Sequence, residues 1–417
     1  MARYIINGGN RLQGTIRVTG AKNSILPILA AVLLSQENII IHDCPKLLDV
    51  ENMIRILIAI GCKVKREGST LIIDPSTVND WNIPDRYVRE IRSSIVFLGA
   101  MLARMRKAKI TYPGGCEIGL RPINLHLKGL RQLGVIIDES GGYLDCHAPR
   151  LVGTEIQLDY PSVGATENIM LAASVAEGTT VIRHAAKEPE IVDLQNFINS
   201  LGGKIRGAGS NTIIIEGVER FRGTEYKVIP DRIVAGTFLV AGAITNGDVT
   251  LTNVIPEHIQ STLAKLREAG CSVWIHDHEV RIKGRDPIRA IDHTITQPYP
   301  GFPTDMQAQL MSLMTLARGT SIITEEIFEN RFKHVGELIR MGANIRIDGK
   351  TAIIQGVERL TGAEVFARDL RGGAALVIAG LRAEGQTIVD NILHIDRGYE
   401  DFDEKLRSVG ADIRRMV

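Results

Sequence analysis

The sequence has few cysteines and few aromatic residues, and each scarcity argues against a class of protein. Its five cysteines are an odd number with no Cys-x-x-Cys pair, which argues against both a disulfide framework and a zinc site. Aromatic residues make up 5% of the chain, and Trp81 and Trp274 do not belong to a stripe of interleaved aromatic and basic residues. A nucleic-acid partner is therefore not predicted.

A charge excess of one sign and a long apolar run are also missing. Lysine and arginine number 49 against 48 acidic residues, so the net charge of +1 favours neither nucleic acid nor an anionic membrane as a partner. The best apolar run, residues 25–34, is interrupted by Pro27 and is too short to span a bilayer. The first residues carry no apolar targeting segment. We expect a soluble, cytoplasmic protein with no membrane partner.

Common cofactor and metal motifs are absent or weak. Neither Gly-x-Gly-x-x-Gly nor a P-loop occurs, so a nucleotide would not be held by those devices. The string His276-Asp277-His278-Glu279 contains metal-ligand residue types, but it falls at the turn of a predicted hairpin, where polar residues are expected in any case. We expect no metal ion and no cofactor.

What the sequence does contain is a sixfold repeat. A helix-like leucine pattern ends in a glycine and is followed by two short β-branched runs. Such a glycine is typical of a helix C-terminus that turns into a strand. Successive copies are 73, 68, 68, 72 and 68 residues apart, and their glycines are Gly61, Gly134, Gly202, Gly270, Gly342 and Gly410.

Each repeat also holds a second helix, rich in alanine and glycine, that suits close packing on all sides. The repeat therefore reads as β-α-β-α-β-β over about 70 residues, with one buried and one exposed helix. Six repeats in 417 residues suggest two α/β domains of three repeats each. Residues 5–18 are predicted as one leading strand that completes the second domain, so the chain would cross between domains twice.

Polar and ionic residues gather where the chain enters the small-residue helices. A helix N-terminus offers free backbone N–H groups and the positive end of a dipole, which suits phosphates and carboxylates. Solvated caps and surface ion pairs are the alternative reading. The six segments contain Lys22-Asn23, Arg92-Ser93, Ser162-Val163-Gly164, Asp231-Arg232, Thr304-Asp305 and Asp369-Leu370-Arg371.

Cys116 differs from the other cysteines in its context. It lies in the glycine-rich residues 113–122, which are predicted to form a loop, and Arg121 follows it closely. A loop thiol near positive charge could serve as a proton donor or a nucleophile. Cys62 and Cys271 occupy the same slot of the repeat and read as small core residues.

Six strings taken together resemble the UDP-N-acetylglucosamine 1-carboxyvinyltransferases (MurA) of the enolpyruvyl transferase family, and the resemblance runs the whole length. They are Gly20-Ala21-Lys22-Asn23-Ser24, the segment 113–122 with Cys116, Ser162-Val163-Gly164-Ala165-Thr166-Glu167-Asn168, Pro303-Thr304-Asp305-Met306-Gln307, Glu329-Asn330-Arg331-Phe332 and Asp369-Leu370-Arg371-Gly372-Gly373.

The resemblance implies two inside-out α/β barrels, one formed by residues 22–229 and carrying the Cys116 loop, the other by residues 1–21 and 230–417, with the active site in the cleft between them. It also implies that the enolpyruvyl group of phosphoenolpyruvate is transferred to the 3′-hydroxyl of UDP-N-acetylglucosamine with release of phosphate, the first committed step of peptidoglycan synthesis. These two substrates are the expected partners, and no obligate protein partner is inferred.

The resemblance further implies roles for individual residues in an addition followed by an elimination. Cys116 is the candidate acid and Asp305 the candidate base, and both are expected to be catalytic together with Lys22 and Arg397. Lys22, Cys116, Arg121 and Arg397 would contact phosphoenolpyruvate, and an epoxide phosphonate such as fosfomycin would alkylate Cys116. The remaining substrate-binding residues would be Asn23, Arg92, Pro122, Ile123, Asn124, Leu125, Ser162, Val163, Gly164, Ile327, Arg331, Asp369 and Arg371.

Two positions depart from the pattern of the resembled family. Asn124 stands where aspartate is common, and a lysine is common near Tyr160. Both positions concern the nucleotide side, so a secondary paralogue with altered affinity stays open. Two alternatives also stay open: a 5-enolpyruvylshikimate-3-phosphate synthase-type transferase, and a non-catalytic protein that binds the UDP-sugar. The residue that removes the proton during elimination is left open as well.

Overall fold

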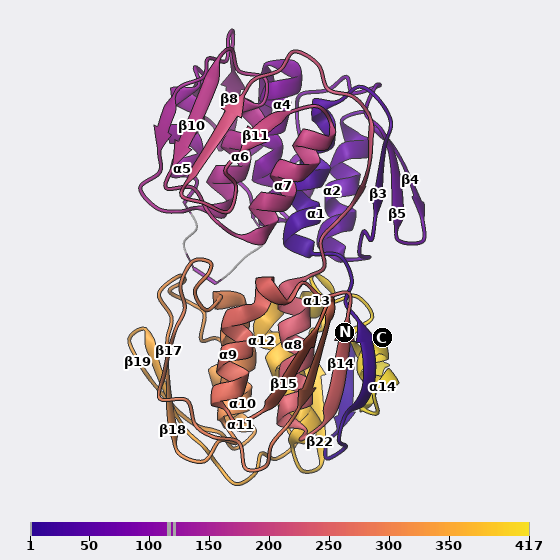
Figure 1. Ribbon diagram of the computed structural model, residues 1–417, viewed down its shortest axis with the longest axis vertical. Coiled ribbons are helices and arrows are strands. Elements are labelled where there is room, and N and C mark those ends of the chain that lie inside the picture. The colour runs from indigo at the N-terminus through magenta and orange to yellow at the C-terminus, as the bar shows by residue number, and fades with distance from the viewer. Residues whose placement is uncertain (1, 115–117, 120–121, 417) are drawn as a thin grey trace. The chain divides into compact units, whose positions relative to one another are not determined.

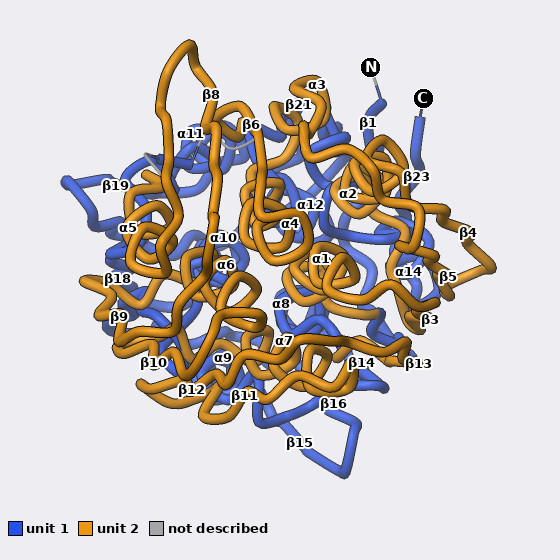
Figure 2. The backbone as a smooth tube through the Cα atoms, turned by 90° about the horizontal axis from the view of Figure 1, so that it is seen from above, with its two compact units in different colours: residues 1–19, 117–120, 230–417 blue, residues 20–116, 121–229 orange. Residues whose placement is uncertain are grey.

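The computed structural model describes residues 2–114, 118–119 and 122–416. The chain forms two compact units, each with its own hydrophobic core. Unit 1 contains residues 1–19, 117–120 and 230–417, and unit 2 contains residues 20–116 and 121–229 (Figure 2). Within the described residues, no helix combines the length and the apolar character needed to cross a membrane.

Unit 2 holds three repeats (Figure 1). The first consists of α1 (Lys22–Ala31) with η1 (Val32–Leu34), β3 (Ile39–His42), α2 (Leu48–Ala59), β4 (Lys63–Glu67) and β5 (Thr70–Asp74). The second consists of α3 (Asp85–Val88), η2 (Arg92–Val96), α4 (Phe97–Met105), β6 (Lys107–Thr111), α5 (Asn124–Gln132), β7 (Ile136–Asp138) and β8 (Tyr143–His147). The third consists of β9 (Glu155–Gln157), α6 (Val163–Ala173), β10 (Thr179–Arg183), α7 (Pro189–Ser200), β11 (Lys204–Arg206) and β12 (Thr212–Glu216).

Unit 1 holds the other three repeats. The fourth follows β13 (Thr224–Lys227), a strand of unit 2, and consists of α8 (Arg232–Ile244), β14 (Asp248–Thr252), η3 (Pro256–Ile259), α9 (Gln260–Glu268), β15 (Ser272–His276) and β16 (Glu279–Lys283). The fifth consists of β17 (His293–Ile295), η4 (Thr304–Met306), α10 (Gln307–Met314), β18 (Thr320–Thr324), α11 (Val335–Arg340), β19 (Asn344–Asp348) and β20 (Thr351–Gln355). The sixth consists of β21 (Glu364–Phe366), α12 (Leu370–Arg382), β22 (Gln386–Asp390), α13 (Leu393–Asp396), α14 (Phe402–Ser408) and β23 (Asp412–Met416).

The described residues of each unit form three small sheets. Unit 1 has the strand orders β21-β22-β1-β23, β15-β16-β14-β2 and β17-β18-β20-β19, where β1 is Arg3–Asn7 and β2 is Gln13–Arg17. Unit 2 has β11-β12-β10-β9, β13-β3-β5-β4 and β6-β8-β7. The predicted architecture of three repeats per α/β domain is confirmed.

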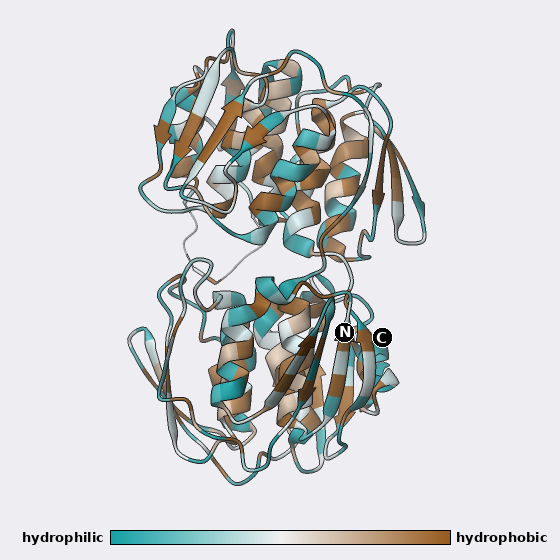
Figure 3. Ribbon diagram, viewed as in Figure 1, coloured by the Kyte–Doolittle hydropathy of each residue, from teal (hydrophilic) through white to brown (hydrophobic). Residues whose placement is uncertain are grey.

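The small-residue helix of each repeat is mostly buried, as its composition predicts; these helices are α1, α4, α6, α8, α10 and α12. In α8 every residue after Arg232 is buried, and all of α10 is buried. In unit 1, α8, α10 and α12 contact one another, and the colouring of Figure 3 shows their apolar residues. Close approach requires small side chains: a Cβ on Gly99 of α4 would lie 2.2 Å from the Asn168 carbonyl oxygen of α6.

The leucine-pattern helix of each repeat is amphipathic and ends two residues before the repeated glycine; these helices are α2, α5, α7, α9, α11 and α14. All six of these glycines have φ between +93° and +110°, the left-handed conformation that a side chain would strain. The glycine spacing therefore marks the helix ends because of a backbone requirement.

The predicted single strand over residues 5–18 is wrong. The chain forms two strands, β1 and β2, in different sheets: β1 pairs with β22 and β23, and β2 pairs in parallel with β14. The break occurs at Gly8 and Gly9; Gly9 has φ +103°, and a Cβ on Gly8 would lie 2.1 Å from the Ala383 carbonyl oxygen. A continuous extended strand is incompatible with that turn.

The two chain crossings exchange strands. β2 precedes α1 of unit 2 but pairs with β14 of unit 1, whereas β13 precedes α8 of unit 1 but pairs in parallel with β3 of unit 2. Each crossing strand therefore completes a sheet in the unit opposite to the helix that follows it.

Candidate active site

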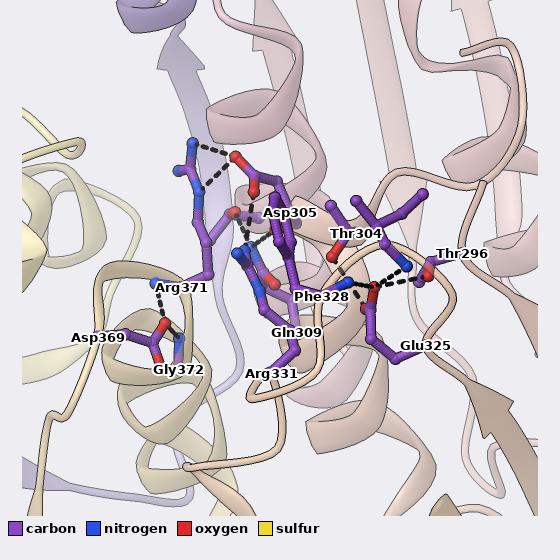
Figure 4. Close-up of polar contacts among 12 residues, drawn as sticks. Thr296, Thr304, Asp305, Gln309, Glu325, Phe328, Arg331, Asp369, Arg371 and Gly372 are labelled. Carbon is purple, nitrogen blue, oxygen red and sulfur yellow. Dashed lines mark hydrogen bonds and ion pairs between the residues drawn. The ribbon is translucent and has the colours of Figure 1, made fainter. Parts of the chain in front are cut away.

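An acidic residue held between two arginines forms the centre of the site in unit 1 (Figure 4). Asp305 lies in η4, directly before α10. Its Oδ1 accepts a hydrogen bond from Arg331 Nη2 at 2.8 Å, and its Oδ2 lies 3.2 Å from Arg371 Nε and 3.1 Å from Arg371 Nη2. The arginine side chains are 4% and 2% exposed, whereas that of Asp305 is 27% exposed. Two buried guanidinium groups thus share one partly exposed carboxylate. The excess positive charge suits an anionic ligand.

Arg371 is fixed by the start of α12. Asp369 is the N-cap of this helix, and its Oδ1 accepts hydrogen bonds from the backbone amides of Arg371 at 3.0 Å and Gly372 at 2.9 Å. This cap is the one expected for aspartate at a helix N-terminus. The Arg371 guanidinium also lies 5.2 Å from the ring centroid of Tyr399, within cation–π distance.

A buried polar network supports the same side of the site. Gln309 Nε2 donates to the Asp305 carbonyl oxygen at 2.8 Å and to Thr237 Oγ1 at 3.1 Å, and it lies 3.3 Å from the Tyr399 hydroxyl. Sequence reasoning missed these residues because their partners come from different repeats. Arg397 follows α13 directly, and α13 packs on α12, so Arg397 belongs to this end of unit 1.

His334 is a buried histidine that interacts electrostatically with Asp369 and Arg331. Its Cβ lies 3.0 Å from the position that a Cβ on Gly372 would occupy. Burial lowers the pKa of His334 well below its ordinary value, although the negative charge of Asp369 opposes the shift. The imidazole is therefore neutral at neutral pH.

In unit 2, Lys22 is paired with an acid that the sequence did not single out. Lys22 begins α1, and its Nζ lies 2.6 Å from Oδ2 of Asp49 in the first turn of α2. The two side chains are 9% and 3% exposed. Acidic residues are common in the first turn of a helix, where they interact favourably with the helix dipole. The sequence around Asp49 therefore does not indicate a pairing with Lys22. Asn23, the next residue of α1, is half-buried.

Arg92 is placed beside the glycine-rich segment. It begins η2, and its Nη1 donates to the Pro113 carbonyl oxygen at 3.4 Å. Cys116 and Arg121 lie outside the described residues. Ile118 is described, and its carbonyl oxygen accepts a hydrogen bond from the Asn330 amide at 3.0 Å within unit 1.

The residues predicted for the nucleotide side come together in unit 2. Ser162 is the N-cap of α6, and its Oγ accepts a hydrogen bond from the Ala165 amide at 3.3 Å. Val163 and Gly164 form the first turn of this helix, while Ile123, Asn124 and Leu125 lie at the start of α5 after Pro122. The two helix starts are neighbours, because a Cβ on Gly164 would lie 3.0 Å from Cε1 of His126.

The tautomer of His126 follows from its neighbour. Asn168 Oδ1 accepts a hydrogen bond from the Gly99 amide, and its Nδ2 contacts both the Ile95 carbonyl oxygen at 2.9 Å and His126 Nδ1 at 2.8 Å. Since Nδ2 donates, His126 Nδ1 accepts, and the proton of a neutral ring is on Nε2. Nε2 is the ring nitrogen 3.2 Å from a Cβ built on Gly164.

No group of three or more His, Cys, Asp or Glu side chains among the described residues is arranged to hold a metal ion. The string at His276 is exposed: His276 and Asp277 side chains are 84% and 83% accessible and lie at a hairpin turn. The four described cysteines are buried. Burial raises the pKa of the Cys62 and Cys146 thiols to about 12 and that of Cys271 to about 11, so these thiols are poor nucleophiles.

Comparisons with known proteins extend over the whole chain. The family model described as EPSP synthase (3-phosphoshikimate 1-carboxyvinyltransferase) matches residues 6–406. UDP-N-acetylglucosamine 1-carboxyvinyltransferase 2 of Caldanaerobacter subterraneus subsp. tengcongensis is 56% identical over 417 residues, covering 100% of both chains. UDP-N-acetylglucosamine 1-carboxyvinyltransferase of Halothermothrix orenii is 50% identical over 416 residues, again with 100% of both chains covered.

Solved structures agree with this relationship. The enolpyruvyl transferase NikO from Streptomyces tendae superposes with a TM-score of 0.90 at 27% identity, covering 100% of this chain and 99% of that chain. EPSP synthase from Acinetobacter baumannii gives a TM-score of 0.76 at 19% identity with 100% of both chains covered, and supports the fold alone. The predicted enolpyruvyl transferase fold is therefore confirmed. This chain belongs to the EPSP synthase family and, within it, to the UDP-N-acetylglucosamine 1-carboxyvinyltransferases.

Proposed function

We propose that this protein transfers the enolpyruvyl group of phosphoenolpyruvate to the 3′-hydroxyl of UDP-N-acetylglucosamine and releases phosphate, a step that supplies peptidoglycan synthesis. The observation that carries this function is the Asp305 carboxylate held between the buried guanidiniums of Arg331 and Arg371. It occurs in a chain that is at least 50% identical, over its full length, to relatives bearing the name of this activity. Both substrates are polyanions, and arginine guanidiniums are well suited to binding phosphate and carboxylate groups.

The reaction runs as an addition followed by an elimination. An acid, for which we propose Cys116, protonates the methylene carbon of phosphoenolpyruvate. Asp305 accepts the proton of the sugar hydroxyl as that oxygen bonds to the adjacent carbon, which gives a tetrahedral phosphate adduct. Loss of phosphate and of one methyl proton then restores the double bond. Lys22, Arg121 and Arg397 pin the carboxylate and phosphate during both steps.

Because Arg331 and Arg371 both contact Asp305, substrate binding can activate Asp305 as the base. A phosphate or carboxylate that reaches Arg331 or Arg371 competes with Asp305 for the same N–H donors. Such competition frees the carboxylate for the sugar hydroxyl once phosphoenolpyruvate is bound. The base is thus released where and when it is needed.

We further propose that both units supply residues to one active site. Lys22, Arg92 and the starts of α5 and α6 belong to unit 2, whereas Asp305, Arg331 and Arg397 belong to unit 1. One reaction that uses both sets requires both units. Ile327 and the residues at the starts of α5 and α6 would hold the UDP-sugar, with Asn124 and Tyr160 tuning its affinity. A cytoplasmic location fits the two metabolites consumed.

The test is phosphate release from phosphoenolpyruvate with either UDP-N-acetylglucosamine or shikimate 3-phosphate as acceptor. We expect phosphate release when the acceptor is UDP-N-acetylglucosamine but not when it is shikimate 3-phosphate. Asp305→Ala should abolish this release. Release with shikimate 3-phosphate would favour the other branch of the family. UDP-sugar binding without any release would favour a non-catalytic binding protein.

A further inference from the structure

A buried glutamate outside the roles assigned above sits at the end of β18. Glu325 is 2% exposed, and its carboxylate accepts four hydrogen bonds (Figure 4). Oε1 accepts from Thr296 Oγ1 at 2.9 Å and from the backbone amides of Ile327 at 2.9 Å and Phe328 at 3.1 Å. Oε2 accepts from Thr304 Oγ1 at 2.9 Å. These four donors compensate the cost of burying the carboxylate.

Three of the four partners of Glu325 come from the two segments that carry the Asp305–Arg331 pair. Thr304 precedes Asp305 in the chain, and Ile327 and Phe328 open the stretch that leads to Arg331. The ring centroid of Phe328 lies 5.7 Å from Cζ of Arg331. Glu325 therefore holds both sides of the 2.8 Å contact between Arg331 and Asp305.

Thr296, the remaining partner of Glu325, fixes the start of the segment that leads from β18 to Arg331. Thr296 Oγ1 donates to Glu325 and accepts from the Glu326 amide at 3.0 Å, and the Thr296 amide donates to the Thr324 carbonyl oxygen at 3.0 Å. The chain from 324 to 328 is thus tied to the end of β17 at several points. Residues 325–328 lie outside helices and strands, so side-chain hydrogen bonds set their backbone path.

We propose that Glu325 is a positioning residue for the enolpyruvyl transfer, which holds Asp305, Ile327 and Arg331 in register through hydrogen bonds to the segments on either side. This role rests on the proposed function. Because the role is one of hydrogen-bond geometry, glutamine can take it over. Its Oε1 accepts from the same three donors, and its Nε2 donates to Thr304 Oγ1, which can accept. Alanine supplies neither group.

The experiment compares Glu325→Ala, Glu325→Gln and Asn199→Ala with wild type. Asn199 is the matched control in unit 2, because its side chain, near the end of α7, ties that helix to β11 with hydrogen bonds of 2.8 Å to the backbone amide and carbonyl of Ile205. Steady-state phosphate release gives kcat and the KM of each substrate. Thermal unfolding reports the stability cost separately.

Glu325→Ala is expected to lower kcat/KM about 10- to 100-fold and to raise the KM for the UDP-sugar, since small misplacements of reacting groups cost that much. Glu325→Gln should stay within about threefold of wild type, and Asn199→Ala should lose thermal stability with kcat/KM nearly unchanged. If Glu325→Ala does not fold, Thr304→Val, which removes the donor next to Asp305, should lower kcat with Asn199→Ala as its control.

Two results would overturn the role of Glu325 while leaving the proposed function intact. One is an active wild type whose Glu325→Ala or Thr304→Val variant keeps full kcat/KM. The other is a Glu325→Gln variant as impaired as Glu325→Ala, which would assign the effect to charge. A wild type that releases no phosphate with UDP-N-acetylglucosamine would overturn the proposed function first, and this role with it.

Discussion

Variants that neutralise Lys22, Asp49 or both should affect the stability of the protein and its activity in different ways. The pair is nearly buried, with 2.6 Å between Nζ and Oδ2, so Lys22→Met removes an ion-pair partner from a desolvated carboxylate. Losing one partner of a buried ion pair costs about 3–5 kcal/mol, whereas neutralising both partners costs far less. Lys22→Met and Asp49→Asn should each destabilise unit 2, and the double variant should recover most of the loss. Activity should not recover, because the cation that we propose to bind phosphoenolpyruvate is still absent.

The assay uses the two tryptophans, since each unit contains one. Trp274 is 50% exposed, so a Trp274→Phe background leaves Trp81 as a fluorescent reporter of unit 2. With an m-value of about 2–3 kcal/mol/M in urea, a loss of about 3 kcal/mol shifts the midpoint by about 1 M. Phosphate release should fall at least about 100-fold in Lys22→Met and in the double variant. A double variant as unstable as the sum of the single variants, or one that regains activity, would refute the reasoning.

Three further outcomes are expected. Iodoacetamide at neutral pH should label native protein at Cys116 alone, so a Cys116→Ala variant should take up almost no label by intact mass; labelling of a buried cysteine would contradict the shielding. Wild type should lose thermal stability relative to His334→Gln as the pH falls below about 6.5, because the unfolded chain binds a proton there that the buried ring, beside Asp369 and Arg331, resists; parallel stability curves would contradict this. Gly164→Ala should raise the KM for the UDP-sugar several-fold, because the added methyl group would lie 3.0 Å from His126; an unchanged KM would count against a substrate role for this turn.

The repeat architecture could be predicted from sequence because local physics encodes it. Small residues mark the buried helices, and the six glycines mark positions that require a left-handed backbone. The sequence places Ser162 and Asp369 where helices are predicted to begin, and both residues cap a helix N-terminus. These features depend on neighbours in sequence, so they can be read directly.

Contacts between elements that are distant in the sequence could not be read in the same way. Asp49 and Glu325 gain their importance from Lys22, Thr296 and Thr304, and those pairings depend on how the separate elements of one repeat pack together. The division of the leading segment into β1 and β2 was missed for a related reason. Alternating hydrophobicity predicts a strand but does not say which sheet it joins.

The most direct test of the account follows the oxygen that bridges carbon and phosphorus in phosphoenolpyruvate. With this oxygen replaced by its heavy isotope and UDP-N-acetylglucosamine as acceptor, mass spectrometry of the products shows which bond breaks. Addition followed by elimination breaks the carbon–oxygen bond, so the isotope should appear in the released phosphate, together with an enolpyruvyl UDP-sugar. Isotope left on the three-carbon product, with unlabelled phosphate released, would mean phosphorus–oxygen cleavage and would contradict the account.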